Sequence, residues 1–185
     1  MARTKDKEPS EQRRQRTCAT MEEHRRLAYL YPEYRRRRRE IELETRQFIA
    51  RYAAEGLRTG IVRIPVVVHV VWNTAAQNVS DAQIQSQIDV LNADFRRTNA
   101  DAASVPAHFA GVAADARIEF ALAVRDPNCG ATTGITRTNT ATTGFTRATR
   151  NNVKSAATGG ADPWPSDRYL NMWVANFTDD LLGFA

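Results

Sequence analysis

A valine-rich apolar segment, followed at once by an amphipathic one, constrains the fold more than any other part of the sequence. Residues 64–72 read I-P-V-V-V-H-V-V-W, a nearly unbroken apolar run rich in β-branched side chains. The run is too short to span a membrane and is typical of a strand that is covered on both faces. It therefore predicts a central strand of a sheet.

The next segment changes from a strand period to a helix period. Its apolar residues are spaced by four, three and four positions, which places on one helix face Ile84, Ile88, Leu91 and Phe95. Ser80 and Gln83 have the spacing of a capping box, so the helix should begin at Ser80. We therefore expect a β-α-β unit, with the next strand parallel to the first after a right-handed crossover.

Four more extended segments are expected downstream. The first alternates with the period of a half-buried strand at Ile118, Phe120, Leu122 and Val124. A short piece at 135–138, a strand at 169–177 and an extended end at 181–185 follow. The loop-rich stretch between Gly130 and Gly160 is of the length that is usually functional or mobile. Cys129 lies in a predicted turn and is expected to be an exposed thiol.

The charge is concentrated at the start of the chain. Residues 1–60 hold 16 Lys and Arg against 10 Asp and Glu, whereas residues 61–185 hold 10 against 11. We therefore expect a basic N-terminal region over 1–60 and a globular part over 61–185. No apolar stretch reaches the length of a transmembrane helix, and the charged start has no apolar core of a secretory signal. No membrane partner is expected.

Within the N-terminal region, residues 1–17 are polar and are expected to be disordered. Pro32 and Gly56 suit the first turn and the end of a helix. A narrow apolar stripe along this helix could lie against a folded body; it consists of Tyr34, Ile41, Phe48 and Tyr52. The run Arg35–Arg39 has two interpretations, a solvated helix face or a contact with anionic polymers such as nucleic acid, of which the second is the minor one.

Several segments resemble one protein family in the same order along the chain. They are I-P-V-V-V-H-V-V-W-N-T, then Q-N-V-S-D-A-Q-I-Q-S-Q-I-D-V-L-N-A-D-F-R-R-T-N, T-T-G-I-T-R-T, W-P-S-D-R-Y-L-N-M-W-V-A-N and the final L-L-G-F-A. Together they are similar to the catalytic domain of pappalysin-like (ulilysin-like) zinc metalloproteases, a branch of the metzincins. The resemblance implies an α/β (α+β) fold with a twisted mixed sheet, a β-α-β start backed by helices, and a helical basic pro-segment.

The resemblance also implies candidate site residues. Cys18 resembles the cysteine of the family's pro-segment switch, whose thiolate takes the zinc position needed by the catalytic water. Ala19 stands where the family has glycine, which would allow close approach or a positive φ. The other interpretation of Cys18 is an unpaired surface thiol. Gly183, Phe184 and Ala185 are candidates for substrate binding at the sheet's edge strand, or they are ordinary strand residues.

The family's zinc site is missing from these residues. Metzincins hold zinc with the three histidines of H-E-x-x-H-x-x-G-x-x-H and use its glutamate as general base. The histidines here are His24, His69 and His108, no two of which are four residues apart, and His69 is expected to be a packed strand residue. We therefore expect a truncated chain that ends before the zinc helix and has no peptidase activity by itself.

Three functions stay open on the sequence. The first is part of a zinc metalloendopeptidase acting on protein or peptide substrates, with zinc in the complete enzyme, calcium possible in the family, and export from the cell. The second is a non-catalytic remnant that binds proteins through an open edge strand. The third is a basic module that binds anionic polymers through Arg35–Arg39.

Overall fold

The computed structural model describes residues 17–55 and 60–185. The strands are β1 (Thr17–Cys18), β2 (Val62–Trp72), β3 (Ile118–Leu122), β4 (Ile135–Asn139), β5 (Leu170–Val174) and β6 (Leu181–Gly183). The α-helices are α1 (Thr20–Leu30), α2 (Pro32–Glu55) and α3 (Asp81–Phe95). Short 3-10 helices are η1 (Ala75–Gln77), η2 (Ala102–Ser104), η3 (Ala107–Phe109), η4 (Arg150–Lys154) and η5 (Ala156–Thr158). The expected disorder of 1–17 and the helix end at Gly56 lie almost wholly outside the described residues.

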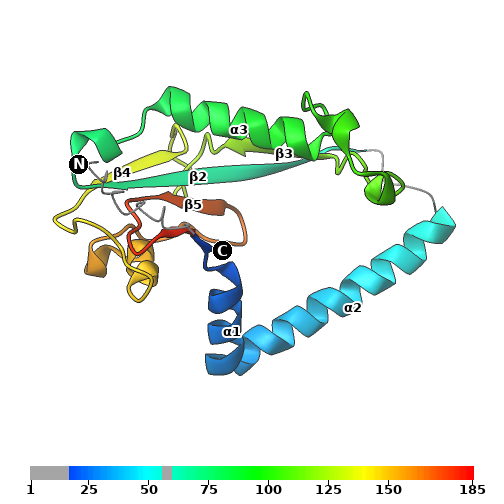
Figure 1. Ribbon diagram of the computed structural model, residues 1–185, viewed down its shortest axis with the longest axis horizontal. Helices are drawn as coiled ribbons and strands as arrows, with labels where there is room; N and C mark the ends of the chain where they lie inside the picture. Colours follow the sequence, from blue (N-terminus) through cyan, green and yellow to red (C-terminus); the bar gives the residue numbers. More distant parts are fainter. Residues whose placement is uncertain (1–16, 56–59) are drawn as a thin grey trace, which may run out of the picture.

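The valine-rich strand β2 is the centre of the main sheet (Figure 1). Its first half pairs with β3, from Val62 with Ile118 onward, and its second half pairs with β4. The middle of β2 also pairs with β5, over the same residues. Because one residue has a single partner on each side, β3 and β4 follow one another along one edge of β2, and β5 takes the other edge. The prediction of a central strand is confirmed.

The strand pairs of this sheet are all parallel, where the sequence analysis expected a mixed sheet. Each strand returns to the sheet through a long connection, which is the condition for parallel pairing. Antiparallel pairing is confined in the described residues to one isolated bridge between Arg125 and Ala131. The α/β class and the parallel β2-α3-β3 unit are confirmed.

Helix α3 begins and packs as its sequence predicts. Ser80 is the N-cap, and its hydroxyl accepts a hydrogen bond from the Gln83 backbone N–H at 3.2 Å. Ile84 and Ile88 are 5% and 2% exposed and contact the valines of β2. At the last position of the helix, Phe95 packs edge-on against Phe120 of β3, with ring centroids 4.9 Å apart.

Alternate residues of β2 enter two different apolar cores, which explains why the strand has no polar face. Val66, Val68 and Val70 face α3, whereas Val71 packs on the opposite side in a core with Phe145. The second core also contains Val153 of η4, Ala161 and, at its margin, Trp173 and Phe184. The second core is the one that supports the end of the chain, because Phe184 belongs to its margin.

His69 lies on this second face and is 1% exposed, which confirms the prediction that it is a packed strand residue. Its Nδ1 lies 2.8 Å from the Thr136 hydroxyl, and its Nε2 lies 3.0 Å from Oδ1 of Asn171. Since Oδ1 only accepts, Nε2 carries a hydrogen and donates it to Asn171. The ring also stacks on Trp173 at a centroid distance of 5.0 Å, and burial lowers the pKa of His69.

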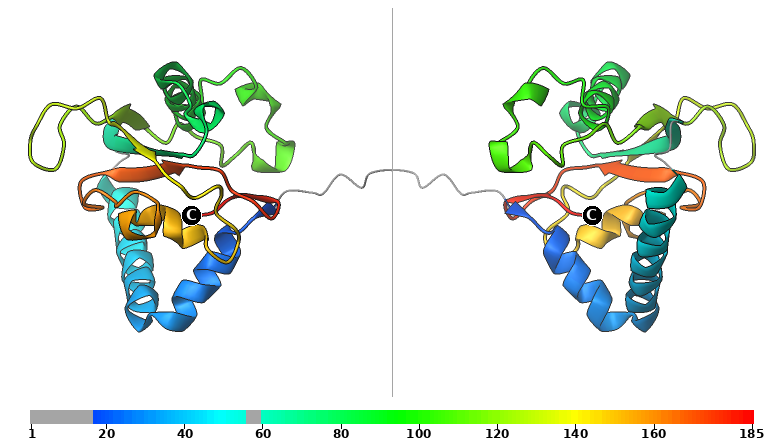
Figure 2. Two further views of the ribbon diagram at one scale, coloured as in Figure 1. Left: turned by 90° about the vertical axis from the view of Figure 1, so that its left-hand side faces the viewer. Right: turned by 90° about the vertical axis from the view of Figure 1, so that its right-hand side faces the viewer.

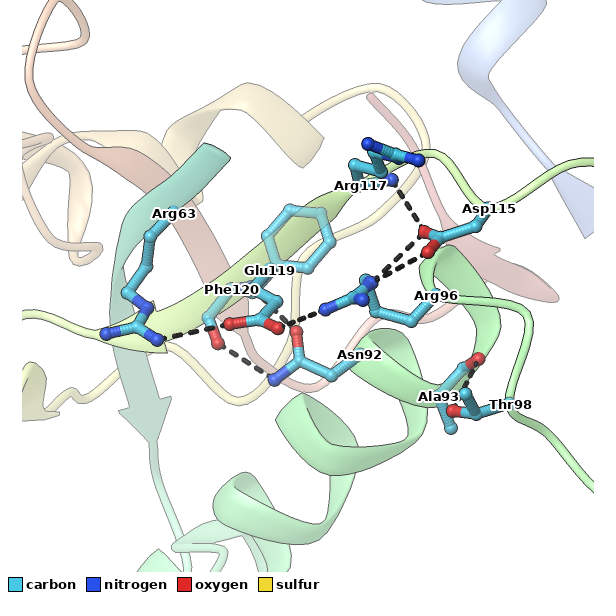
Figure 3. A network of polar contacts seen from close by, with 9 residues as sticks. All are labelled: Arg63, Asn92, Ala93, Arg96, Thr98, Asp115, Arg117, Glu119 and Phe120. Atoms are coloured by element: carbon cyan, nitrogen blue, oxygen red, sulfur yellow. Dashed lines mark hydrogen bonds and ion pairs between the residues drawn. The ribbon is translucent and has the colours of Figure 1, made fainter. Parts of the chain in front are cut away.

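The free edge of β3 is covered by a side chain rather than by another strand (Figure 3). The Asn92 amide of α3 donates to the Phe120 carbonyl at 3.0 Å, and its Oδ1 accepts from the Phe120 N–H at 2.7 Å. Arg96, the C-cap residue that follows α3, extends this network to Glu119 and Asp115. One amide side chain thus satisfies both backbone groups that a neighbouring strand would bind.

Strand β3 ends earlier than the alternating pattern predicts. It stops at Leu122, and Val124 is 74% exposed. After the turn, the chain passes close to the end of β3 at Gly134. This residue has a positive φ of 73°, and a Cβ added to it would lie 2.6 Å from the Ala123 backbone nitrogen. This close return positions β4 beside β2 directly after β3.

The two N-terminal helices meet at an angle below the sheet (Figures 1 and 2). Helix α2 begins at Pro32, as predicted. Its apolar stripe does not lie against the body, because Ile41 and Phe48 are 54% and 46% exposed, so this expectation is wrong for the described side chains. Helix α2 is the longest one described, and no described helix is both long and apolar enough to span a bilayer.

Candidate functional site

The start of the described chain pairs with its end. Strand β1 lies parallel to β6, with Thr17 opposite Leu181 and Cys18 opposite Gly183 (Figure 2). The Thr17 N–H donates to the Asp180 carbonyl at 2.8 Å, and the Ala19 N–H donates to the Gly183 carbonyl at 2.9 Å. The sequence analysis considered an open edge strand, whose backbone N–H and carbonyl groups would need partners. The N-terminal segment is such a partner.

The three candidate substrate residues all lie at this junction. The carbonyl of Gly183 accepts a hydrogen bond from the Ala19 N–H, and the Ala185 N–H donates to the Thr20 hydroxyl at 3.1 Å. Phe184 is half-buried and packs edge-on against Phe177 at 5.9 Å. In the described residues β6 is not part of the four-stranded sheet, and the N-terminal segment uses the backbone groups through which another strand would pair with it.

Cys18 is exposed and lies directly in the pairing segment. Its sulfur is 3.0 Å from the Thr20 hydroxyl, and hydrogen bonds from the side chain and then the backbone of Thr20 lower the pKa of the Cys18 thiol. A lowered pKa increases the thiolate fraction, which is the form that binds metals. Its role as a zinc ligand remains a prediction.

Ala19 does not need the freedom of glycine. Its φ is −99°, so the backbone is not in the left-handed region, and the residue is fully buried behind β6. A methyl group therefore fits at the position where the family pattern has glycine. The substitution does not prevent the segment from lying on the edge strand.

A buried carboxylate fixes α1 to the body. Glu23 is 2% exposed, and its Oε2 lies 2.9 Å from Nη2 of Arg150, which is itself 8% exposed. Asn151 donates to both carboxylate oxygens at 3.1 and 3.2 Å, and Arg26 of α1 binds Oε1 at 2.6 Å. The hydrogen bond from Arg26, followed by that from Asn151, lowers the pKa of Glu23 to about 2 against the effect of burial.

A second, more exposed contact lies beside the first. Arg147 donates to the Glu22 carboxylate at 2.6 Å and to the Thr17 hydroxyl at 2.7 Å. Glu22 is 48% exposed at its side chain, so this pair adds little to stability. Sequence reasoning missed both contacts, because the partners are more than 120 residues apart and nothing local marks Glu22 or Glu23 as special.

The remaining histidines form no metal site with these residues. His24 bonds Tyr34 and Arg38 within the N-terminal helices, and His108 lies in η3 against Phe109. Over residues 17–55 and 60–185, no three or more His, Cys, Asp or Glu side chains gather closely enough to hold a metal ion. Cys129 is an exposed thiol, as expected.

Three solved structures are similar to this chain. Mirolysin in complex with compound 9 is 56% identical with a TM-score of 0.62, over 65% of this chain and 45% of that one. Mature mirolysin of Tannerella forsythia in complex with a cleaved peptide is 56% identical with a TM-score of 0.59, over 63% and 43%. A promirolysin mutant of the same organism is 43% identical with a TM-score of 0.66, over 91% and 52%. No family model and no curated protein matches the sequence.

The match with the pro-form extends much further along the chain than the matches with the other two structures. The matched share of this chain is larger by about a quarter of its length with the pro-form, which is comparable to the length of residues 17–60. The chain belongs to the metzincin family. This metzincin chain spans about half the length of the mirolysin chains that it matches. The relationship is therefore to a metalloprotease family, and it includes the pro-segment.

Proposed function

We propose that this chain supplies the pro-segment and the N-terminal half of the catalytic domain of a zinc-dependent metalloendopeptidase. The similarity to mirolysin and promirolysin supports the family, and mirolysin has been solved with a cleaved peptide. Protein or peptide substrates are therefore the proposed partners. The proposal divides the chain at residue 60 into a latency region and the first part of the catalytic domain.

The observation that carries this proposal is the pairing of β1 with β6. A peptide substrate binds such an edge strand by adding its own backbone to the sheet. Here the backbone N–H groups of the N-terminal segment donate hydrogen bonds to the carbonyls of Asp180 and Gly183, at 2.8 and 2.9 Å. A segment that fills the substrate's place in the same polypeptide keeps the enzyme latent until it is removed.

The residues described here do not complete a zinc site. A structural or catalytic zinc takes three or four nitrogen, sulfur or oxygen ligands, whereas the described residues hold no group of three such side chains that could bind a metal ion, although Cys18 lies opposite β6. In our proposal the other ligands come from outside these 185 residues. The chain by itself then binds and covers the edge strand but does not cleave peptides.

The direct test joins the missing half to the chain. The part of mirolysin that the match leaves uncovered is fused after Ala185, and cleavage of a peptide is measured with and without a zinc chelator. We expect zinc-dependent cleavage by the fusion protein and none by the 185-residue chain. A folded, zinc-loaded fusion protein without activity would contradict the proposal, and so would cleavage by the short chain.

Replacing Cys18 in the fusion protein separates its two interpretations. If Cys18 is the latency ligand, Cys18→Ser raises activity before the pro-segment is removed, because serine is a poor zinc ligand. Cys129→Ser is the matched control, since Cys129 is also an exposed thiol but lies far from β6 in the sequence. Equal activity of both variants and the parent would show that Cys18 is an unpaired thiol.

The two other functions have less support. One edge of β6 is already covered by β1, which leaves less of the strand open to another protein. Within the arginine run, Arg36 and Arg37 pair with Glu40, and Arg38 contacts His24, which favours a solvated helix face over a surface that awaits an anionic polymer. Calcium binding and export from the cell, which the family resemblance implies, remain predictions.

A further inference from the structure

Two of the groups that hold Glu23, Arg150 and Asn151, belong to the body and lie beside the end of β6. Arg150 and Asn151 are both part of η4, a short helix whose Val153 is buried in the second core. Arg150 lies 5.7 Å from the ring of Phe184, the residue that follows β6. Two of the three residues that hold the carboxylate, Arg150 and Asn151, therefore lie next to β6 and outside the pro-segment, whereas the third, Arg26, is part of α1.

Arg150 is held in place independently of Glu23. Its Nη1 donates to the Arg147 carbonyl, within η4 and the residues before it. Its Nε is buried and has no hydrogen-bond partner in the described part of the chain. Lys154, one turn along η4, lies 4.4 Å from the Phe184 ring and adds a second positive charge. When the pro-segment leaves, Glu23 goes with it, and the guanidinium of Arg150, which is 8% exposed with α1 in place, loses its anion.

A guanidinium and an amide that are held in this orientation bind a carboxylate through charge-assisted hydrogen bonds, so this site favours a carboxylate that can reach it. A peptide that adds to β6 passes close to it. Glu23 lies one helical turn after the pairing segment ends, and an extended chain covers that distance in about two residues.

We propose that Arg150 and Asn151 form a binding subsite for an acidic side chain of a peptide that lies along β6. The side chain would stand about two residues beyond the last residue paired with the strand. In the latent chain, Glu23 occupies this subsite as a built-in mimic of that acidic residue. The inference rests on the proposed function for the identity of the peptide as a substrate, but the binding itself requires no zinc and no cleavage.

The test empties the subsite in the full 185-residue chain and offers it a free carboxylate. In Glu23→Ala, the melting temperature is measured at pH 7 against sodium acetate, with sodium chloride at the same ionic strength as reference. We expect a saturable rise of about 3 °C that is specific to acetate, because ligand binding to the native state raises its stability. The parent chain, whose subsite is filled, should not respond.

Two further variants decide whether the effect comes from this site. Glu22→Ala removes the neighbouring exposed carboxylate, and we expect no specific response to acetate from it. Adding Arg150→Met to Glu23→Ala should abolish the response. The proposal is overturned if Glu23→Ala responds equally to acetate and chloride, or if the double variant still responds to acetate.

If Glu23→Ala does not fold, Glu23→Ser keeps a polar side chain at this position and still leaves the subsite empty for acetate. The side-chain amide resonance of Asn151 is then followed by NMR while acetate is added. A saturable shift supports the subsite, because the amide donates to the carboxylate there. An unchanged resonance up to a high acetate concentration contradicts it. Neither readout depends on peptidase activity, so this inference can fail while the proposed function stands.

Discussion

At the scale of single residues, the burial of one titratable side chain could be predicted from the sequence and the burial of another could not. His69 was predicted to be a packed strand residue, because it lies inside an unbroken apolar run, and it is 1% exposed. The burial of Glu23 was not predicted, because a glutamate in a highly charged helix is expected to be exposed to solvent. Its burial depends on Arg150, 127 positions away, which no local pattern connects to it.

Glu23 makes the docking of α1 sensitive to acid. The Arg26 and Asn151 contacts lower its pKa from 4.5 to about 2, so the unfolded state binds more protons between these values. Stability is therefore full above pH 4.5 and falls by at most about 3 kcal/mol as the pH drops towards 2. Urea unfolding followed from pH 6 to pH 2.5 checks this. Glu23→Gln should remove this component of the profile, and a parallel loss in the variant would contradict the assignment.

His69 should act in a higher pH range with the same sign. Burial lowers the pKa of this base, so the neutral ring is favoured in the folded state. Stability is then present above about pH 6.5 and is lost as the pH falls below the unfolded pKa. Thermal unfolding between pH 8 and pH 5 measures the loss. His69→Gln, which cannot be protonated, should show a flatter profile over this range even if it is less stable overall.

At the scale of elements, segments with a clear local pattern were predicted, and contacts between distant segments were not. The start of α3 and the parallel strand order of β2 and β3 followed from Ser80 and from the apolar periods. The pairing of β1 with β6 joins residues more than 160 positions apart, and a two-residue strand has no periodicity. The exposed stripe of α2 was misjudged because a helical period shows only which face is apolar, not what covers it.

Asn92 is expected to protect the free edge of β3. Asn92→Ala leaves the Phe120 backbone N–H and carbonyl without these partners, and we expect a loss of about 2 kcal/mol in urea unfolding. The exposed edge should also promote self-association, which sedimentation velocity detects. Gln85→Ala, at an exposed position of the same helix, is the control. Equal stability and oligomeric state of the two variants would show that Asn92 does not protect the edge.

At the scale of the whole molecule, the two ends of the chain are held less firmly than the centre. The main sheet has a core on each face of β2, whereas β6 is paired in the described residues only with the two-residue strand β1. The size of the protein and its family resemblance could be read from the sequence. The way in which the N-terminal region closes over β6 could not, because it depends on Glu23, Arg150 and the backbone of Gly183 together.

This arrangement predicts a melt with low cooperativity for the 185-residue chain. The β1–α1–β6 region should open before the β2 core, because far less apolar surface is buried around it. Near-ultraviolet and far-ultraviolet circular dichroism should therefore give different transition midpoints, or the opened chain should self-associate. A single sharp transition of a monomer, identical for both signals, would be inconsistent with this view.

Amide hydrogen exchange at Thr17 and Ala19 tests most directly whether the N-terminal segment covers the edge strand. Both amides donate to the body, at 2.8 Å to Asp180 and 2.9 Å to Gly183. We predict that both are protected in the native chain, and that Glu23→Ala removes their protection while the amides of β2 stay protected. Exchange of Thr17 and Ala19 at the rate of an unstructured peptide in the parent chain would contradict the account.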